Sequence, residues 1–312
     1  MIRIATIDSK TLTRQSGLSM VELMVAMALG LFLVLALVQI LINGKESFGS
    51  ANHLSRLQET GRIATGLMIT DLKRAGYMGG NSDIPNIFGS TGQLNPDLTC
   101  VTGNSTWVRM VSQPVEGVDD SNAGYTCIPD ATYLRGDVVT VRYTAPFVAV
   151  GALDNNRLYL RSSLFEGKIF VGSAEAQAVN QVMDTPQNVR ELLAYSYFVG
   201  DSGRTCNGAT VPSLFRVRVD EIGQPIVEEL LPGIDNLQAR YSDGQRYYDA
   251  DNVPDWDAVI AARIWLLVRA ECAETGFTDG NTYNMGDQSI TPNDSFRRQL
   301  YSSVVMIRNF RN

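Results

Sequence analysis

A long apolar segment near the N-terminus limits the folds that are open to this chain. From Leu18 to Ile42 there are 25 residues, and all but four of them are apolar. As an α-helix the segment would be about 37 Å long, which is enough to cross the hydrocarbon core of a bilayer. No small-residue cleavage site of the secretory type follows it. The sequence therefore predicts a helix that anchors the chain in a membrane.

A simple anchor does not account for Glu22, which lies inside this apolar segment. No polar partner is close to Glu22 in the sequence. A charged side chain costs about 3 kcal/mol at the centre of a membrane helix, so such a residue marks a functional site by default. The alternative interpretation is that Glu22 lies at the level of the lipid headgroups, because only four residues of the segment precede it.

A short basic leader precedes the apolar segment and ends at Gly17. It carries Arg3, Lys10 and Arg14 against a single acidic residue, Asp8. Loops with an excess of basic residues stay in the cytoplasm. The leader is therefore predicted to be cytoplasmic, and the chain beyond the membrane helix is predicted to lie in the periplasm.

A basic leader that ends in glycine, followed by an apolar helix with glutamate at its fifth position, resembles the type IV prepilin signal. The resemblance implies that prepilin peptidase cleaves between Gly17 and Leu18, and that Leu18 is then N-methylated. It also implies an intersubunit salt bridge between Glu22 and the N-terminal amine of a neighbouring subunit, which would fix the stagger between subunits. Two details depart from the family pattern: Leu18 replaces the usual phenylalanine, and Arg14 is not directly beside the glycine.

Beyond the membrane segment an amphipathic helical pattern continues to Tyr77. Apolar residues recur at spacings near three and four between residues 54 and 75, with polar residues between them. We expect a bend or local melting at Asn43–Gly44, because glycine weakens a helix. The glycines between residues 76 and 80 are expected to end the helix.

The residues after this helix indicate a β-rich head. Residues 81–130 are rich in loop-forming residues, and several of the later runs alternate apolar and polar residues as strands do. The eight strand-like runs are 137–144, 157–161, 168–172, 195–200, 214–219, 237–242, 262–269 and 302–307. The predicted fold class is α+β and type IV pilin-like: a long N-terminal transmembrane and amphipathic helix packed on a large, mostly antiparallel β region. The pattern leaves open whether this region is one sheet or two.

The predicted organisation has four parts. Residues 1–17 form a cytoplasmic leader that is cleaved, and residues 18–42 form the transmembrane helix. Residues 43–77 form the amphipathic continuation of the helix, and residues 78–312 form a periplasmic globular head. The chain is thus expected in the inner membrane as a single-pass protein, and later at the pilus tip on the cell surface.

The cysteines are the second structural signal. There are four, Cys100, Cys127, Cys206 and Cys272, and none lies in a C-x-x-C pair. A metal site is not predicted, because the only histidine, His53, is far from all of them in the sequence. An even number of cysteines in an exported domain predicts two disulfides, for which three pairings exist. We favour Cys100–Cys127 and Cys206–Cys272, because these bridges are local and each stays within one half of the head.

Several classes of function are disfavoured by the sequence. A net charge of −7 without a basic tract argues against nucleic acid as a partner. No nucleophile elbow, phosphate-binding loop or dinucleotide motif is present, so neither an enzyme nor a cofactor is predicted. The Asp- and Asn-rich stretches 243–257 and 279–294 could supply calcium ligands, but they lack EF-hand spacing, and we interpret them as solvated turns.

Two further stretches narrow the resemblance to one kind of pilin. They are Asp71–Tyr77, which reads DLKRAGY, and Arg297–Asn309, which reads RRQLYSSVVMIRN. Together with the length of the chain, they resemble the PilW-type minor pilins of the type IV pilus. The J-type pseudopilins of type II secretion have a similar C-terminal strand, and a pseudopilin is the alternative. A single-pass periplasmic enzyme or receptor is a third class, which an uncleaved Gly17 would favour.

The resemblance to PilW-type minor pilins implies a non-enzymatic structural role. Such a subunit belongs to a tip complex that primes pilus assembly and supports cell adhesion and twitching motility. The implied partners are other minor pilins, the major pilin, a large tip adhesin, prepilin peptidase and the inner membrane.

Overall fold

The structure is a computed structural model, and it describes residues 17, 19–90, 106–172, 186–220 and 224–309. The chain forms two compact units, Met1–Asn52 and His53–Asn312. The first helix, α1, runs from Met20 to Arg74 and contributes to both units.

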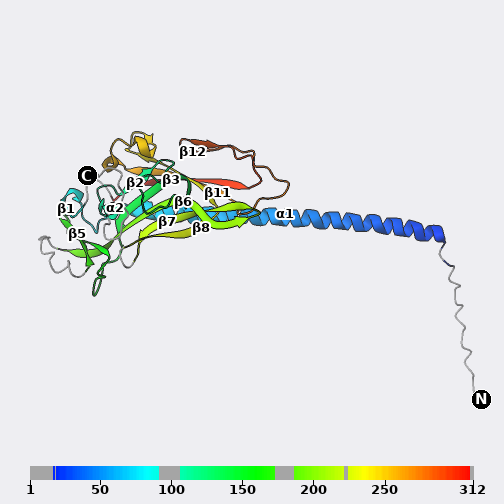
Figure 1. The fold of residues 1–312 in the computed structure, drawn as a ribbon, viewed down its shortest axis with the longest axis horizontal. Coiled ribbons are helices and arrows are strands. Elements are labelled where there is room, and N and C mark those ends of the chain that lie inside the picture. Colours follow the sequence, from blue (N-terminus) through cyan, green and yellow to red (C-terminus); the bar gives the residue numbers. More distant parts are fainter. Residues whose placement is uncertain (1–16, 18, 91–105, 173–185, 221–223, 310–312) are drawn as a thin grey trace, which may run out of the picture. The chain divides into compact units, whose positions relative to one another are not determined.

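In the first unit, α1 is continuous (Figure 1), and its described residues are exposed except Gly49 and Ser50, which are half-buried. Its most apolar window has a mean hydropathy of 2.8, so by length and composition the helix could cross a membrane. The local melting expected at Asn43–Gly44 is not found, since both residues are helical. A single glycine costs a helix only about 1 kcal/mol, and the leucine- and alanine-rich run before it consists of strong helix formers.

In the second unit, α1 buries one face in the core of the head. Leu57, Ala64, Met68 and Leu72 are nearly inaccessible to solvent. Their spacings of seven, four and four residues place them on a single stripe of the helix. The predicted amphipathic pattern therefore corresponds to a helix that packs on strands.

The larger sheet has eight strands, with the order β1-β5-β4-β6-β3-β2, and with β7 and β8 continuing from β6. All described pairs in this sheet are antiparallel except β1 with β5. The strands are β1 (Ile87–Phe88), β2 (Val115–Val118), β3 (Tyr133–Thr144), β4 (Leu158–Ser162), β5 (Gly167–Val171), β6 (Asn188–Cys206), β7 (Ala209–Val219) and β8 (Pro225–Pro232).

A second sheet has four strands in the order β10-β9-β11-β14, and a separate hairpin pairs β12 with β13. These strands are β9 (Ile234–Ser242), β10 (Tyr247–Tyr248), β11 (Ala261–Arg269), β12 (Tyr283–Met285), β13 (Gln288–Ile290) and β14 (Arg298–Met306). The short helical turns are η1 (Ile84–Asn86), α2 (Thr106–Arg109), η2 (Ala250–Asn252) and η3 (Trp256–Ala258). The question of one sheet or two is thereby settled: the described head has two main sheets and one hairpin.

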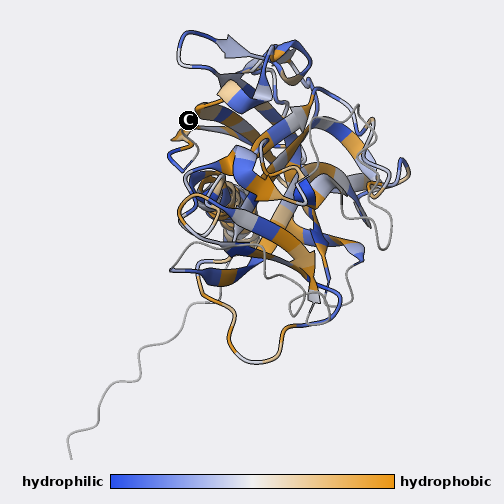
Figure 2. Ribbon diagram, turned by 90° about the vertical axis from the view of Figure 1, so that its left-hand side faces the viewer, coloured by the Kyte–Doolittle hydropathy of each residue, from blue (hydrophilic) through white to orange (hydrophobic). Residues whose placement is uncertain are grey.

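The α+β class and the mostly antiparallel β region are confirmed, and each of the eight predicted runs overlaps a strand. The two main sheets share one core, in which buried residues of β3, β6, β9 and β11 lie in the same cluster. Between the sheets, the Asp137 carboxylate on β3 accepts the backbone N–H of Ala239 on β9 at 2.7 Å. Figure 2 shows apolar and polar segments interleaved along the strands, as expected for strands with one face in such a core.

A glycine in α1 allows the C-terminal strand to approach the helix. The ring of Tyr301 on β14 lies against Gly61, and a Cβ built at Gly61 would overlap that ring. The Tyr301 hydroxyl donates to the carbonyl of Leu57 at 3.3 Å. The glycine is therefore required for close packing of strand and helix, in spite of its cost to the helix.

We expect Gly61→Ala to destabilise the head by about 1–3 kcal/mol, because the added methyl group must displace the Tyr301 ring. Gly66→Ala is the matched control, since nothing lies within 4 Å of a Cβ built there. That change should stabilise the helix by about 1 kcal/mol. Thermal unfolding of both variants tests this contrast, and equal effects of the two substitutions would contradict it.

Candidate assembly site

The N-terminal residues that carry the predicted processing and assembly functions lie at the start of α1. Gly17 is exposed, and Leu18, the predicted N-methylated residue, lies outside the described residues. The backbone N–H of Ser19 donates to Glu22 Oε2 at 3.0 Å, and the N–H of Val21 donates to Ser19 Oγ at 3.2 Å. Ser19 and Glu22 thus form a capping box at the beginning of the helix.

This cap was not predicted from the sequence, from which Glu22 was interpreted as an assembly residue or as a side chain at the level of the lipid headgroups. The signal was available, because a serine three residues before a glutamate at the start of a helix is the capping-box pattern. A carboxylate in the first turn also interacts favourably with the helix dipole. Glu22 therefore has a local structural role within its own chain, and its pairing with a neighbouring subunit stays a prediction.

The DLKRAGY stretch ends the helix and attaches it to the larger sheet. Asp71 is buried and accepts hydrogen bonds from the hydroxyl of Tyr143 on β3, at 2.7 Å, and from that of Tyr197 on β6. Burial, followed by the nearby Asp71 charge, raises the pKa of both tyrosines well above the ordinary value. Both phenols therefore stay protonated, as donors to the carboxylate must.

The residues after Asp71 end the helix and bond its last turn to β3. Gly76 has a φ of 78°, in the left-handed region that ends helices, and its N–H donates to the carbonyl of Arg142 on β3 at 3.0 Å. The carbonyl of Tyr77 accepts the N–H of Thr144 at 2.8 Å. The stretch is thus explained as a helix terminus joined to β3 by backbone hydrogen bonds.

The C-terminal stretch from Arg297 meets the same helix end. The side-chain amide of Asn309 donates to the carbonyl of Lys73 at 2.9 Å. Arg298 is buried, and its guanidinium pairs with Asp294 at 2.6 Å and with Asp235 at 2.7 Å. The two stretches that resemble PilW-type proteins, far apart in the sequence, therefore lie against each other.

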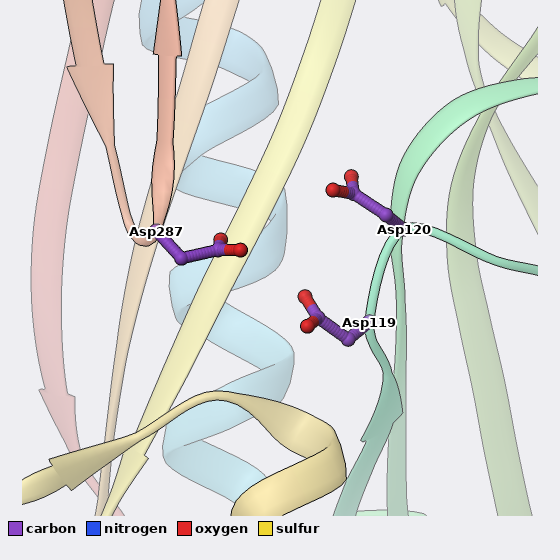
Figure 3. Close-up of side chains that lie close together, drawn as sticks. All are labelled: Asp119, Asp120 and Asp287. Carbon is purple, nitrogen blue, oxygen red and sulfur yellow. The ribbon is translucent and has the colours of Figure 1, made fainter.

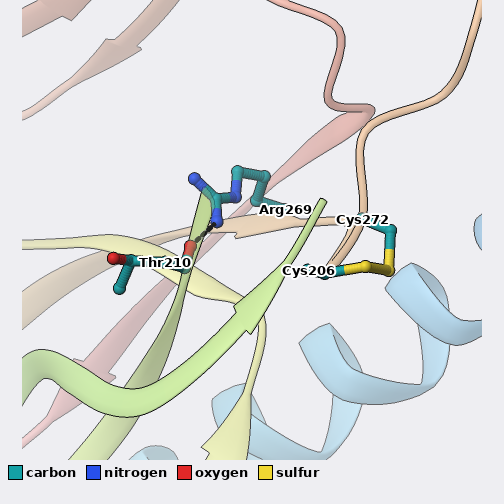
Figure 4. The surroundings of a disulfide bond; sticks show 4 residues. All are labelled: Cys206, Thr210, Arg269 and Cys272. Carbon is teal, nitrogen blue, oxygen red and sulfur yellow. Dashed lines mark hydrogen bonds between the residues drawn. A yellow bond between two sulfur atoms is a disulfide. The ribbon is translucent and has the colours of Figure 1, made fainter. Parts of the chain in front are cut away.

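The cysteines behave as expected from the sequence, as far as the structure describes them. Cys206, at the end of β6, is disulfide-bonded to Cys272, which follows β11, with a Cα–Cα distance of 5.1 Å (Figure 4). Beside the bridge, Arg269 donates to the carbonyl of Thr210. Cys127 is also disulfide-bonded, but Cys100 lies outside the described residues, so the Cys100–Cys127 pairing stays a prediction.

The two acidic stretches are not simply solvated turns, because they contain short strands and short helical turns, and Asp279 is buried. Most of their aspartates accept hydrogen bonds or form ion pairs within the chain. Asp243 accepts the backbone N–H groups of Gln245 and Arg246, and Asp249 pairs with Arg240 at 2.5 Å. Asp294 pairs with Arg298. Asp287 differs, because its carboxylate lies beside those of Asp119 and Asp120, from a loop that was not predicted to carry a site (Figure 3).

Comparisons with known proteins locate two family signatures in the chain. Residues 196–309 match the family model of the type IV pilus-assembly protein W, and residues 12–38 match that of the prokaryotic N-terminal methylation motif. No curated protein matches the chain. Among solved structures, it is similar to a type IV-like pilin from Thermus thermophilus, with 13% identity and a TM-score of 0.38, over 82% of this chain and 99% of that one.

Proposed function

We propose that this chain is a type IV pilus minor pilin of PilW type and a subunit of a tip complex that primes pilus assembly. The observation that carries the proposal is the combination of a methylation motif over residues 12–38 with a PilW-type region over residues 196–309. The first belongs to subunits that are processed and packed through their N-terminal helix, and the second favours a PilW-type pilin over the alternative, a pseudopilin of type II secretion. The role is structural rather than catalytic.

Processing by prepilin peptidase would remove residues 1–17 and leave N-methylated Leu18 as the first residue. Residues 18–42 would then span the inner membrane, with residues 43–77 continuing the helix and residues 78–312 forming the periplasmic head. The apolar helix and the basic leader support this topology.

Glu22 would join each processed subunit to its neighbour. Its Oε2 accepts the Ser19 N–H within its own chain, and a carboxylate has about four acceptor positions on its two oxygens. The capping box therefore leaves capacity for the N-terminal amine of a neighbouring subunit. Pairing would remove the cost of two isolated charges in an apolar helix bundle, which is the reason to place the carboxylate there.

The size of the head supports a place near the tip rather than along the shaft. The predicted head, residues 78–312, makes up most of the chain, and its described part folds into two main sheets. Repetition of so large a head at every position of a helical shaft would produce clashes. A few copies near the tip could contact the other minor pilins, the major pilin and a large tip adhesin, and could support adhesion and twitching motility.

Gene deletion with complementation tests the proposal. Deletion should strongly reduce surface pili while the major pilin still accumulates in the membrane, because the nucleus for assembly is missing. Complementation with Glu22→Ala should give a protein that inserts into the membrane but does not restore piliation. Glu59→Gln is the matched control, since it removes an exposed carboxylate farther along the same helix. Normal piliation in the deletion strain, or abundant labelled copies along the whole shaft, would refute the priming role.

A further inference from the structure

Three carboxylates from two distant parts of the chain meet on the head. Asp119 and Asp120 directly follow β2, and Asp287 lies in the turn between β12 and β13. One oxygen of each lies within 4.8 Å of the others. Figure 3 shows the three side chains pointing toward one another from the two loops. Like charges held so close repel each other unless a proton or a cation separates them.

Two oxygen atoms at this cluster are buried and, among the described residues, receive no hydrogen bond. One is Oδ1 of Asp119, and the other is Oε1 of Gln238 on β9. Gln238 is only 1% exposed, and its Nε2 donates to Asp120 Oδ1 at 2.8 Å, so its amide group lies directly at the cluster. A buried oxygen without a donor is costly in a folded protein. These orphaned oxygens supply the acceptors that a bound cation requires.

The charge around the cluster is strongly negative. Burial, followed by the carboxylates of Asp287, Asp120, Asp249 and Asp251, raises the pKa of Asp119 from 3.8 to about 6. Burial, more than the nearby charges, raises the pKa of Asp137 on β3 from 3.8 to about 8. Two tyrosines, Tyr133 on β3 and Tyr241 on β9, also lie within electrostatic range of Asp119.

We propose that Asp119, Asp120 and Asp287, together with Oε1 of Gln238, bind a calcium ion. All four ligands are oxygens, which suit a hard cation, and calcium accepts six to eight oxygens in irregular geometry. Water would complete the coordination. Magnesium is less suited, because it requires nearly octahedral geometry and holds its own waters tightly. The ion would link the loop after β2 to the β12–β13 hairpin, and the inference holds whether or not the chain primes a pilus.

The test uses the full chain in detergent micelles, titrated with calcium chloride or magnesium chloride. At pH 7.5 and about 5 mM calcium we expect the Tm of the wild-type protein to rise by about 3 °C, which corresponds to submillimolar affinity. Magnesium should give less than half of this shift. Asp119→Asn and Asp287→Asn should weaken calcium binding by at least about tenfold in isothermal titration, because each removes one charged ligand. Glu59→Gln, which removes an exposed carboxylate on α1, should retain the full response.

A Tm unaffected by calcium, an equal response to magnesium, or an unchanged response in both asparagine variants would overturn the proposal.

Discussion

Replacement of Gly17 by arginine is expected to leave nearly all of the chain as uncleaved precursor. The wild-type protein should be recovered as a mature chain that begins at Leu18. Its net charge should be −9 rather than −7, because the lost leader carries three basic residues and one acidic residue. In the Gly17→Arg variant the leader should be retained. Mass spectrometry of the N-terminal peptide from membranes measures both forms directly.

The surroundings of Gly17 indicate why the Gly17→Arg variant would not be cleaved. Gly17 is exposed, and nothing in the described chain lies within 4 Å of a Cβ built there, so the substitution has room at this position. A loss of cleavage would therefore arise in the peptidase, where the bulk of arginine excludes the junction. Gly49→Arg is the control, because nothing lies within 4 Å of a Cβ built there either, and it should be cleaved normally. Efficient cleavage of Gly17→Arg, or an intact leader in the wild-type protein, would refute this assignment of the junction.

The second large expected effect is a loss of stability when a buried arginine in the head is replaced. Arg142 on β3 is completely buried, and its guanidinium donates to the carbonyls of Trp107 and Gln113 and to the carboxylate of Glu116 at 2.6 Å. Arg142→Met should destabilise the head by about 3–5 kcal/mol, because the carboxylate and two carbonyls lose their charged partner. Denaturant unfolding of the full chain in detergent measures this loss.

Two further variants test whether this loss comes from the unpaired buried charge. Arg263→Met on β11 replaces an exposed arginine that stacks on Trp265, and it should cost about 1 kcal/mol or less. The double variant Arg142→Met/Glu116→Leu should recover part of the loss, because no unpaired carboxylate is left behind. A cost for Arg142→Met no larger than that of Arg263→Met would contradict the role assigned to the buried arginine.

The alternating and helical patterns of the sequence were sufficient to predict α1 and eight strands, because local hydrophobic periodicity determines such elements. They missed β8, β10, β12 and β13. In β8, prolines at both ends and the acidic pair Glu228–Glu229 conceal the pattern of a strand. The structure supplies the reason that β8 forms nonetheless: Glu228 pairs with Arg216 and Arg218 on the adjacent strand β7. Cross-strand charge pairs of this kind are visible only once the register is known.

The candidate sites likewise include some that the sequence alone could predict and one that it could not. Gly17, Leu18 and Glu22 could be proposed from the sequence, because a single short stretch carries the residues that resemble the prepilin signal. The calcium cluster could not, since Asp119 and Asp287 lie far apart in the sequence and are brought together only by the docking of a hairpin on a distant loop. The stretch that contains Asp287 was considered as a source of calcium ligands, but nothing local distinguished that residue from the turn aspartates around it.

The contact between β14 and α1 has a consequence for the order of folding. Tyr301 bonds to Leu57 across 244 residues of chain, and Asn309 bonds to Lys73 across 236. The helix face is therefore translated more than 230 residues before part of its partner surface. Closing a loop of this length carries an entropic cost and slows folding, so the helix face stays incompletely covered until β14 has been made and has packed on it.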